Sequence, residues 1–123
     1  MKDCGRKNFI IKTKVWIENS QRDLLFGKGK TEILQHIESE GSIAKAAEKM
    51  NLNYKKAWTH IKILQKNIDD RMVISQKGGK GTGGTSLTPT ARSMVAKYQQ
   101  LQREIESFAN QRFQELFFSK KKK

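Results

Sequence analysis

The chain has 123 residues, which is enough for one domain with a single hydrophobic core. Its 25 lysines and arginines outnumber its 12 aspartates and glutamates, and the resulting formal net charge of +13 predicts a polyanion as partner. The single cysteine excludes a disulfide framework within the chain, and the sequence shows no apolar run typical of a membrane span or a signal peptide, so we expect a cytoplasmic protein.

The first predicted element is a strand over residues 9–18, in which apolar and β-branched side chains alternate with more polar ones. The residues expected to share its buried face are Phe9, Ile11, Thr13, Val15 and Ile17. A short apolar run at residues 24–26 and a flexible basic link at residues 27–30 follow. A helix with one apolar face is then expected over residues 31–39.

The central prediction is a pair of helices joined by the three residues 51–53. Ser42 is a favourable N-cap for a helix over residues 43–50, and Asn53 is one for a second helix over residues 54–68. This arrangement is typical of a helix-turn-helix, whose second helix enters the DNA major groove. The buried stripe of the second helix is predicted to be Tyr54, Ala57, Ile61, Leu64 and Ile68.

A cationic row is predicted on the opposite face of the second helix, because lysines recur there at helical spacing. The row consists of Lys55, Lys56, Thr59, Lys62 and Lys66. Such a row either contacts DNA or is only the solvated side of an amphipathic helix. The tight turn before the helix favours the first interpretation.

Two short strands are predicted around a glycine-rich segment. Residues 71–76 and 85–87 have strand character, whereas residues 78–84 contain too many glycines for regular structure. Lys77 and Lys80 accompany this segment, so a hairpin wing would bring positive charge and a closely approaching backbone to a phosphate. The alternative is a connecting loop.

Thr88 and Pro89 predict a helix start, because a capping hydroxyl precedes proline at the first helical position. The helix is expected to continue to about residue 118. Its apolar residues form a heptad seam at Met94, Tyr98, Leu101, Ile105 and Phe108. We expect this seam to hold a homodimer, with a helix folded back on its own domain as the alternative. The predicted domains are residues 1–88 and 89–123.

No arrangement of residues predicts an active site, so we do not expect an enzyme. Gly79, Gly81 and Gly84 have the spacing of a dinucleotide-binding fingerprint, but that motif must join a strand to a helix, and a strand intervenes here. His36 and His60 lie on different predicted helices without a second ligand at suitable spacing. We therefore expect no metal site and no cofactor.

One group of motifs extends over most of the chain: Phe26-Gly27-Lys28-Gly29, Gly41-Ser42-Ile43, Ala46-Ala47, Tyr54-Lys55 with Ala57-Trp58, and Gly78-Gly79-Lys80-Gly81 leading to Leu87-Thr88. Together they resemble the N-terminal DNA-binding domain of the ModE family of molybdate-responsive transcriptional regulators. The resemblance implies a LysR-type winged helix-turn-helix, a homodimer held by the long helix, and operator binding at genes of molybdate uptake or of molybdoenzymes. Asn53 stands where serine is common in that family, and we expect this chain to lack the family's molybdate-binding module.

The predicted fold class is α+β, mainly α: a winged helix-turn-helix with an N-terminal strand, a glycine-rich β-hairpin wing and a long C-terminal dimerisation helix. Double-stranded DNA is the expected partner, and the expected contact residues are Ser42, Asn53, Tyr54, Lys55, Lys56, Thr59, Lys62, Lys77 and Lys80. Core or rim packing is the alternative role for Tyr54 and Trp58. Two other functions fit the charge and the helix. They are a nucleoid or RNA-binding protein without sequence preference, and an adaptor that recruits another protein.

Overall fold

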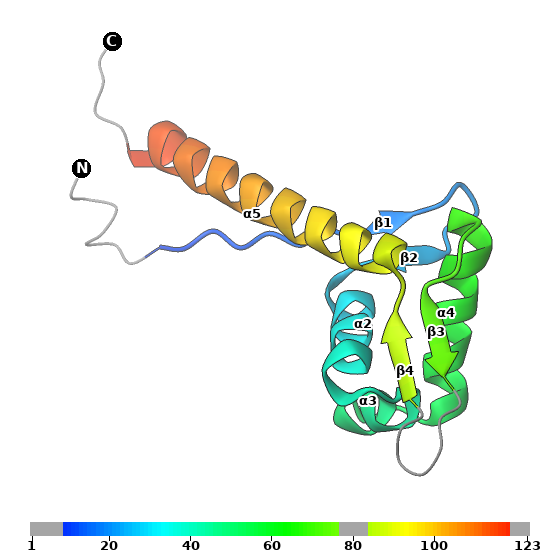
Figure 1. Ribbon diagram of the computed structural model, residues 1–123. Helices are drawn as coiled ribbons and strands as arrows, with labels where there is room; N and C mark the ends of the chain where they lie inside the picture. Colours follow the sequence, from blue (N-terminus) through cyan, green and yellow to red (C-terminus); the bar gives the residue numbers. More distant parts are fainter. Residues whose placement is uncertain (1–8, 77–83, 119–123) are drawn as a thin grey trace. The chain divides into compact units, whose positions relative to one another are not determined.

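The computed structural model describes residues 9–76 and 84–118. The chain forms two compact units: Trp16–Tyr98, here called the central unit, and Met1–Val15 with Gln99–Lys123, called the terminal unit. The elements in chain order (Figure 1) are β1 (Ile17–Glu18), β2 (Leu24–Phe26), α2 (Lys28–Glu40), α3 (Ile43–Lys49), α4 (Tyr54–Ile68), β3 (Val73–Gln76), β4 (Gly84–Leu87) and α5 (Pro89–Phe118).

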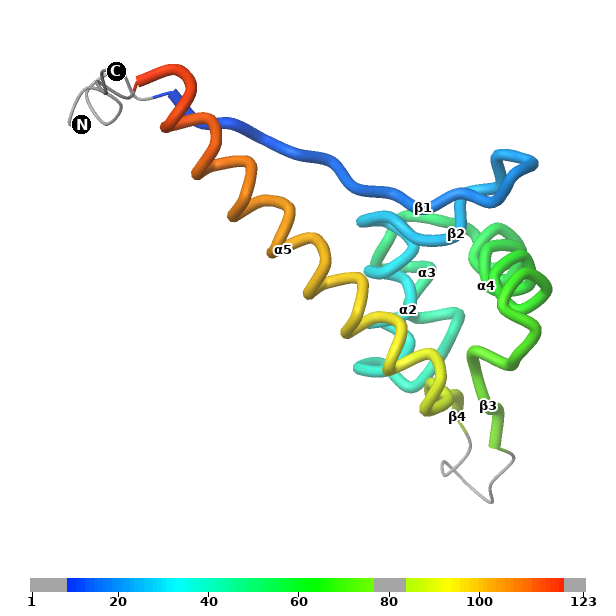
Figure 2. Tube along the Cα trace, turned by 90° about the horizontal axis from the view of Figure 1, so that it is seen from above, coloured from blue at the N-terminus to red at the C-terminus, as the bar shows by residue number. Residues whose placement is uncertain are grey.

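The core of the central unit lies between α2, α3 and α4 and is completed by the β3–β4 hairpin and the first turns of α5 (Figure 2). Each helix buries one apolar face, as its residue spacing predicts. The ring of Tyr98 stacks on that of Phe26, with centroids 6.1 Å apart. The least exposed large side chains are Leu34, Ile37, Ile61, Met72 and Val73. The winged helix-turn-helix and its mainly helical composition are therefore confirmed.

Helix α2 begins at Lys28, inside the segment that the sequence predicted to be a flexible link. The first helical backbone bond runs from the N–H of Thr31 to the carbonyl of Gly27, over 3.0 Å. Gly29 is tolerated because it lies in the first turn, where glycine disturbs few helical hydrogen bonds. The helix ends at Gly41, whose φ of 69° is left-handed and suits glycine.

The predicted strand over residues 9–18 is wrong except at its end. Only Ile17 and Glu18 form β1, which pairs antiparallel with β2 through Ile17 opposite Phe26 and Glu18 opposite Leu24. The predicted alternation is present as burial in part. Ile11, Thr13 and Val15 are half-buried and the residues between them are exposed, but Phe9 and Ile17, also predicted to be buried, are exposed. An extended chain packed on one side produces the same period of two as a strand, without any sheet hydrogen bonds.

The predicted hairpin is confirmed, and β4 is anchored to the end of α2. Strands β3 and β4 pair antiparallel, with Val73 opposite Leu87 and Gln76 opposite Gly84. The N–H of Thr85 donates to the carbonyl of Gly41 over 2.9 Å. A Cβ on Gly84 would lie 3.1 Å from that same carbonyl oxygen, so this close approach favours glycine. Lys77 and Lys80 lie outside the described residues.

The terminal unit contains the second half of α5 and the extended residues 9–15. An aromatic cluster lies at the C-terminal end of the helix, where the ring of Phe113 is 5.1 Å from that of Phe117 and 5.3 Å from that of Phe118. Phe9 joins this cluster with its ring 5.8 Å from Phe118. The phenylalanines of the helix in this cluster lie off the predicted seam, and the cluster covers its members only in part, since Phe9 and Phe117 are 58% and 70% exposed.

Candidate nucleic-acid interface

The turn between α3 and α4 is a hydrogen-bonded helix stop followed by a helix start. Asn51 has a left-handed φ of 61°, and its N–H donates to the carbonyl of Glu48 over 3.1 Å. The N–H of Leu52 donates to the carbonyl of Ala47 over 2.8 Å, which completes a Schellman motif. Asn53 then caps α4, because its Oδ1 accepts from the N–H of Lys56 over 2.7 Å. The turn therefore fixes the direction in which α4 begins.

Helix α4 presents a cationic surface to solvent. Ala57, Ile61 and Leu64 are buried beneath it. The helix contains four lysines and no acidic residue. Its exposed outer face consists of Lys55, Lys56, Thr59, Lys62 and Lys66. The structure thus brings the predicted contact residues of this helix together on one accessible face.

Tyr54 is the main exception to the predicted pattern of α4. The sequence places it in the buried stripe, but it is 51% exposed. It is the first residue of the helix, and Lys55 and Lys56 beside it are exposed as well. Ile68, the last residue of the helix, and Trp58 are half-buried. Tyr54 is therefore available for contact with a partner, whereas Trp58 lies at the rim of the core.

Three of the predicted contact residues already have hydrogen-bond roles within the fold. The Oγ of Ser42 accepts from the N–H of Lys45 over 3.1 Å and so caps α3. Asn53 caps α4 in the same way. The hydroxyl of Thr59 donates to the carbonyl of Lys55 over 2.9 Å, which leaves its methyl group and its acceptor capacity. The predicted caps are confirmed, and contacts between these residues and DNA remain predictions.

Lys30 and His60 extend this cationic face, and the sequence did not predict them as contacts. The Nζ of Lys30 on α2 lies 2.7 Å from the Nδ1 of His60 on α4. Burial lowers the pKa of His60, and the charges of Lys30 and Lys56 lower it further. Burial also lowers the pKa of Lys30, against the opposing effect of Asp23. Helical spacing places His60 next to Lys56, but nothing in the sequence indicates the contact between α2 and α4.

A depression of about 400 Å³ surrounds this pair at the start of α4. Three elements contribute to it: β2, α2 and α4 with its capping residue. Its lining residues are Leu24, Lys30, Asn53, Lys55, Lys56, Thr59, His60 and Ile63. The cationic face is therefore hollowed at one edge rather than uniformly convex.

Side-chain hydrogen bonds hold α4 at its far end. The Nδ2 of Asn19, in the turn between β1 and β2, donates to the Oδ1 of Asn67 over 2.7 Å. The N–H of Met72, just before β3, donates to the Oε1 of Gln65 over 3.0 Å. These bonds fix the helix relative to both hairpins. A fixed helix can present its lysines with a defined spacing.

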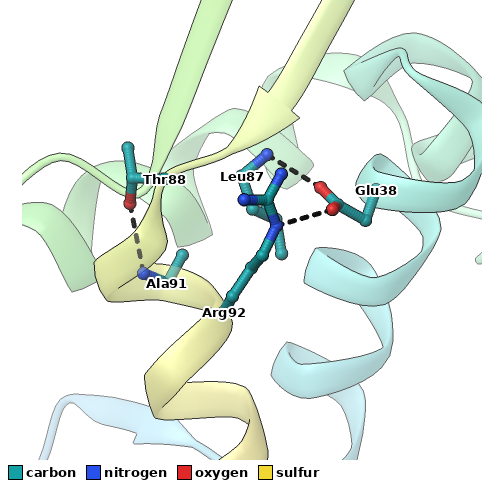
Figure 3. A network of polar contacts seen from close by, with 5 residues as sticks. All are labelled: Glu38, Leu87, Thr88, Ala91 and Arg92. Atoms are coloured by element: carbon teal, nitrogen blue, oxygen red, sulfur yellow. Dashed lines mark hydrogen bonds and ion pairs between the residues drawn. The ribbon is translucent and has the colours of Figure 1, made fainter.

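A second network ties the hairpin and α5 to α2 (Figure 3). The carboxylate of Glu38 accepts from the N–H of Leu87 over 3.0 Å and from the Nε of Arg92 over 2.7 Å. These two hydrogen bonds, with that of Arg92 the stronger, lower the pKa of Glu38. Thr88 caps α5, since its Oγ1 accepts from the N–H of Ala91 over 3.1 Å and donates to the carbonyl of Arg71 over 2.7 Å. The predicted start of α5 is confirmed.

The residues of the predicted seam lie in different surroundings. Tyr98 is buried in the central unit, so it belongs to its own protomer's core. Met94 is half-buried. Leu101, Ile105 and Phe108 are 41%, 36% and 64% exposed. The exposed part of the seam is thus confined to the second half of α5.

Within the described residues, 9–76 and 84–118, none of the helices combines the length and the apolar character that a membrane span requires. Nor do three or more histidine, cysteine, aspartate or glutamate side chains gather there as a metal site would require.

The fold and the cationic helix define a winged helix-turn-helix DNA-binding protein. The chain belongs to the family described as bacterial regulatory helix-turn-helix protein, lysR family, which matches residues 30–92. This is a family of DNA-binding transcription regulators and not of enzymes. The recognised resemblance to ModE is confirmed by the relatives described next.

Molybdenum transport protein ModE of Azotobacter vinelandii is 40% identical over 75 residues, which cover 61% of this chain and 28% of that protein. Transcriptional regulator ModE of Haemophilus influenzae is 33% identical over 86 residues, which cover 70% of this chain and 34% of that protein. The chain therefore spans about a third of the length of these relatives. A structure of Vibrio fischeri DarR in complex with DNA is similar with a TM-score of 0.49 and 18% identity, over 70% of this chain and 28% of that one.

Proposed function

We propose that this LysR-type regulator acts on genes of molybdate uptake or of molybdoenzymes and reads their operators through the outer face of α4. The observation that carries the proposal is a helix-turn-helix whose second helix exposes four lysines and has no acidic residue. Relatives named for molybdenum transport support the choice of target genes. A homodimer would present two such helices to neighbouring turns of the major groove.

The proposed contacts divide into positioning and reading. Lys55, Lys56 and Lys62 are exposed and can donate to phosphates or to guanine edges. Thr59 offers its methyl group to a thymine methyl, and Tyr54 lies exposed in the first turn. Two further lysines, Lys77 and Lys80, would bind the flanking backbone, while Ser42 and Asn53 would act chiefly by holding the helix starts.

The proposed dimer uses the exposed part of the seam. Leu101, Ile105 and Phe108 share one face of α5 and are open to solvent in a single protomer. Met94 would extend that face. Tyr98 does not contribute to the proposed dimer contact, because it is buried within its own chain. In this arrangement residues 1–88 carry the reading head and residues 89–123 form the dimerisation helix.

The function is tested by measuring affinity for DNA from upstream of molybdenum genes in the same genome. Fluorescence anisotropy compares that DNA with a scrambled duplex of equal length, with and without molybdate. Specific binding should be at least about a thousandfold tighter than binding to the scrambled DNA. Equal affinity for both duplexes would contradict sequence-specific regulation and would favour a nucleoid or RNA-binding role.

The reading face is tested by the salt dependence of the same affinity. A dimer in which about four of the five proposed lysine contacts per protomer reach phosphates would neutralise about eight phosphates, for a slope of log affinity against log salt of about −7. The double variant Lys55→Ala with Lys56→Ala should reduce that slope to about −3.5. Lys12→Ala with Lys14→Ala is the matched control, because it removes the same charge from the terminal unit.

A further inference from the structure

We propose that Lys30 and His60 form a phosphate-binding pair at the edge of the reading face, and that binding of a DNA phosphate there is coupled to uptake of one proton by His60. The inference rests on the proposed DNA-binding function and adds two contact residues and a pH dependence to it. Neither residue belongs to the contact set that the sequence predicts.

The geometry of the pair defines its protonation state. A lysine ammonium can only donate, so the Nδ1 of His60, 2.7 Å from the Nζ of Lys30, must accept. The imidazole is then neutral and carries its proton on Nε2. In this state the pair is satisfied without an anion.

The position of the pair makes a DNA phosphate its natural ligand. The depression around it is also lined by Asn53, Lys55, Lys56 and Thr59, all of which are predicted DNA contacts. A backbone that lies against the start of α4 therefore passes the mouth of the depression. Phosphate oxygens accept from lysine and from protonated histidine alike.

The charges around His60 are almost all positive. Lys56 lies on its own helix and Lys30 reaches it from α2, and both lower its pKa in addition to the effect of burial. Asp23, in the turn between β1 and β2, is the acidic group that acts on Lys30. Among the described residues that line the depression, Leu24 and Ile63 are apolar and none is acidic. The lining of the depression itself therefore supplies no negative charge, and a bound anion would supply it.

A phosphate in the depression would reverse the balance at His60. Its negative charge favours the protonated imidazole, whose Nδ1–H becomes a donor. The contact with Lys30 then opens, and both side chains donate to phosphate oxygens. Because the complex holds more protons than the free protein, acidification favours the complex.

Proton NMR can follow this coupling directly, because the chain has only two histidines. The ring resonances of His60 are titrated with pH in the free protein and in its DNA complex. The pKa of His60 should be higher in the DNA complex than in the free protein by at least about one pH unit, because a nearby negative charge favours the protonated ring. His36 lies on α2 outside the depression, so its resonance serves as the internal reference.

Inorganic phosphate without DNA separates the two sources of the oxyanion. A rise of the His60 pKa with DNA alone assigns the site to the nucleic-acid backbone, and a rise with both ligands makes it a general oxyanion site. Both results support the pair. A His60 pKa that neither ligand changes overturns it. If DNA still binds in that case, only the pair fails, whereas loss of all DNA binding removes the proposed function itself.

The pH dependence of DNA affinity gives a second readout. As the pH falls from the His60 pKa of the complex toward the lower pKa of the free protein, the affinity should rise by up to about tenfold per pH unit for each protomer, or about a hundredfold for a dimer. His60→Gln preserves an acceptor for Lys30 but cannot titrate, so its affinity should lose this rise. His36→Gln should retain it. A His60→Gln protein with the natural pH dependence would contradict the proposal.

Discussion

The two units of this protein use apolar residues in opposite ways. In the central unit Ile37 and Ile61 are almost completely buried, and Ser42, Asn53 and Thr88 cap its helices. In the terminal unit the apolar residues of α5 remain open, with Phe108 at 64% and Phe117 at 70% exposure. The central unit therefore buries its apolar side chains within itself, whereas the exposed apolar surface of the terminal unit is suited to contact with another protein chain.

The largest expected effect separates the two units by stability. Ile61→Ala removes a side chain that is 1% exposed, so it should lower the free energy of unfolding by about 2–5 kcal/mol. The matched substitution Ile105→Ala acts at a side chain that is 36% exposed, and it should cost much less in a dilute sample. Urea denaturation monitored by circular dichroism measures both. Equal losses would refute the distinction between the units.

The next effect concerns assembly rather than folding. The double variant Leu101→Gln with Ile105→Gln places two polar side chains on the exposed seam of each protomer. The proposed dimer would contain four substituted side chains, and each should weaken association by about 0.8 kcal/mol. The free energy of dimerisation should therefore fall by about 3 kcal/mol, which raises the dissociation constant about a hundredfold. Light scattering measures the mass against the protomer's 14.2 kDa.

The control for the seam variant is Arg103→Gln, which lies between the two seam positions on the opposite side of the helix. It should leave the mass unchanged. A natural protein that is monomeric at micromolar concentration would rule out the dimer and would favour the adaptor function.

A smaller effect tests the junction between α2 and α3. Gly41 has a left-handed φ of 69°, and a Cβ added there would meet no atom within 4 Å, so Gly41→Ala should cost only the backbone strain of about 1–2 kcal/mol. The same change at Gly29, in the first turn of α2, also meets nothing within 4 Å. Because alanine favours helix, Gly29→Ala should instead stabilise by up to about 1 kcal/mol. Thermal unfolding of the pair tests the opposite signs.

Sequence patterns predicted the central unit well where the determinants were local. The caps Ser42, Asn53 and Thr88 precede their helices directly, and apolar spacing placed Ile61 and Leu64 in the core. The prediction for residues 9–16 was wrong because one-sided packing and strand pairing share a period of two. Local patterns report which side of a segment is covered, but not what covers it.

The contacts that the sequence missed join residues far apart in the chain. Lys30 meets His60, and Glu38 meets Leu87 and Arg92, only after the helices have packed. Tyr98 is a second example. Its heptad position predicted a contact with a partner subunit, but its ring stacks on Phe26 of its own chain. Long-range pairing is a property of the fold and leaves no periodic signal in the sequence.

The smallest expected effect lies at Glu38, which links the hairpin and the start of α5 to α2 (Figure 3). The hydrogen bonds from Arg92 and from the N–H of Leu87 lower its pKa below 4.5 in the folded state. Its contribution is therefore complete above about pH 5 and is lost as the pH falls through the lowered pKa. Glu38→Gln should cost about 0.5–1 kcal/mol at neutral pH, since the pair is exposed.

The same difference should vanish below the folded-state pKa of Glu38, where the natural side chain is itself protonated and resembles glutamine. Urea denaturation at a series of pH values from about 7 downward measures this convergence. Glu106→Gln, at an exposed position in the terminal unit, is the matched control and should change stability little at either pH. If the Glu38→Gln difference persisted unchanged in acid, the carboxylate charge would not be what ties the hairpin to α2, and the shape of the side chain alone would account for the link.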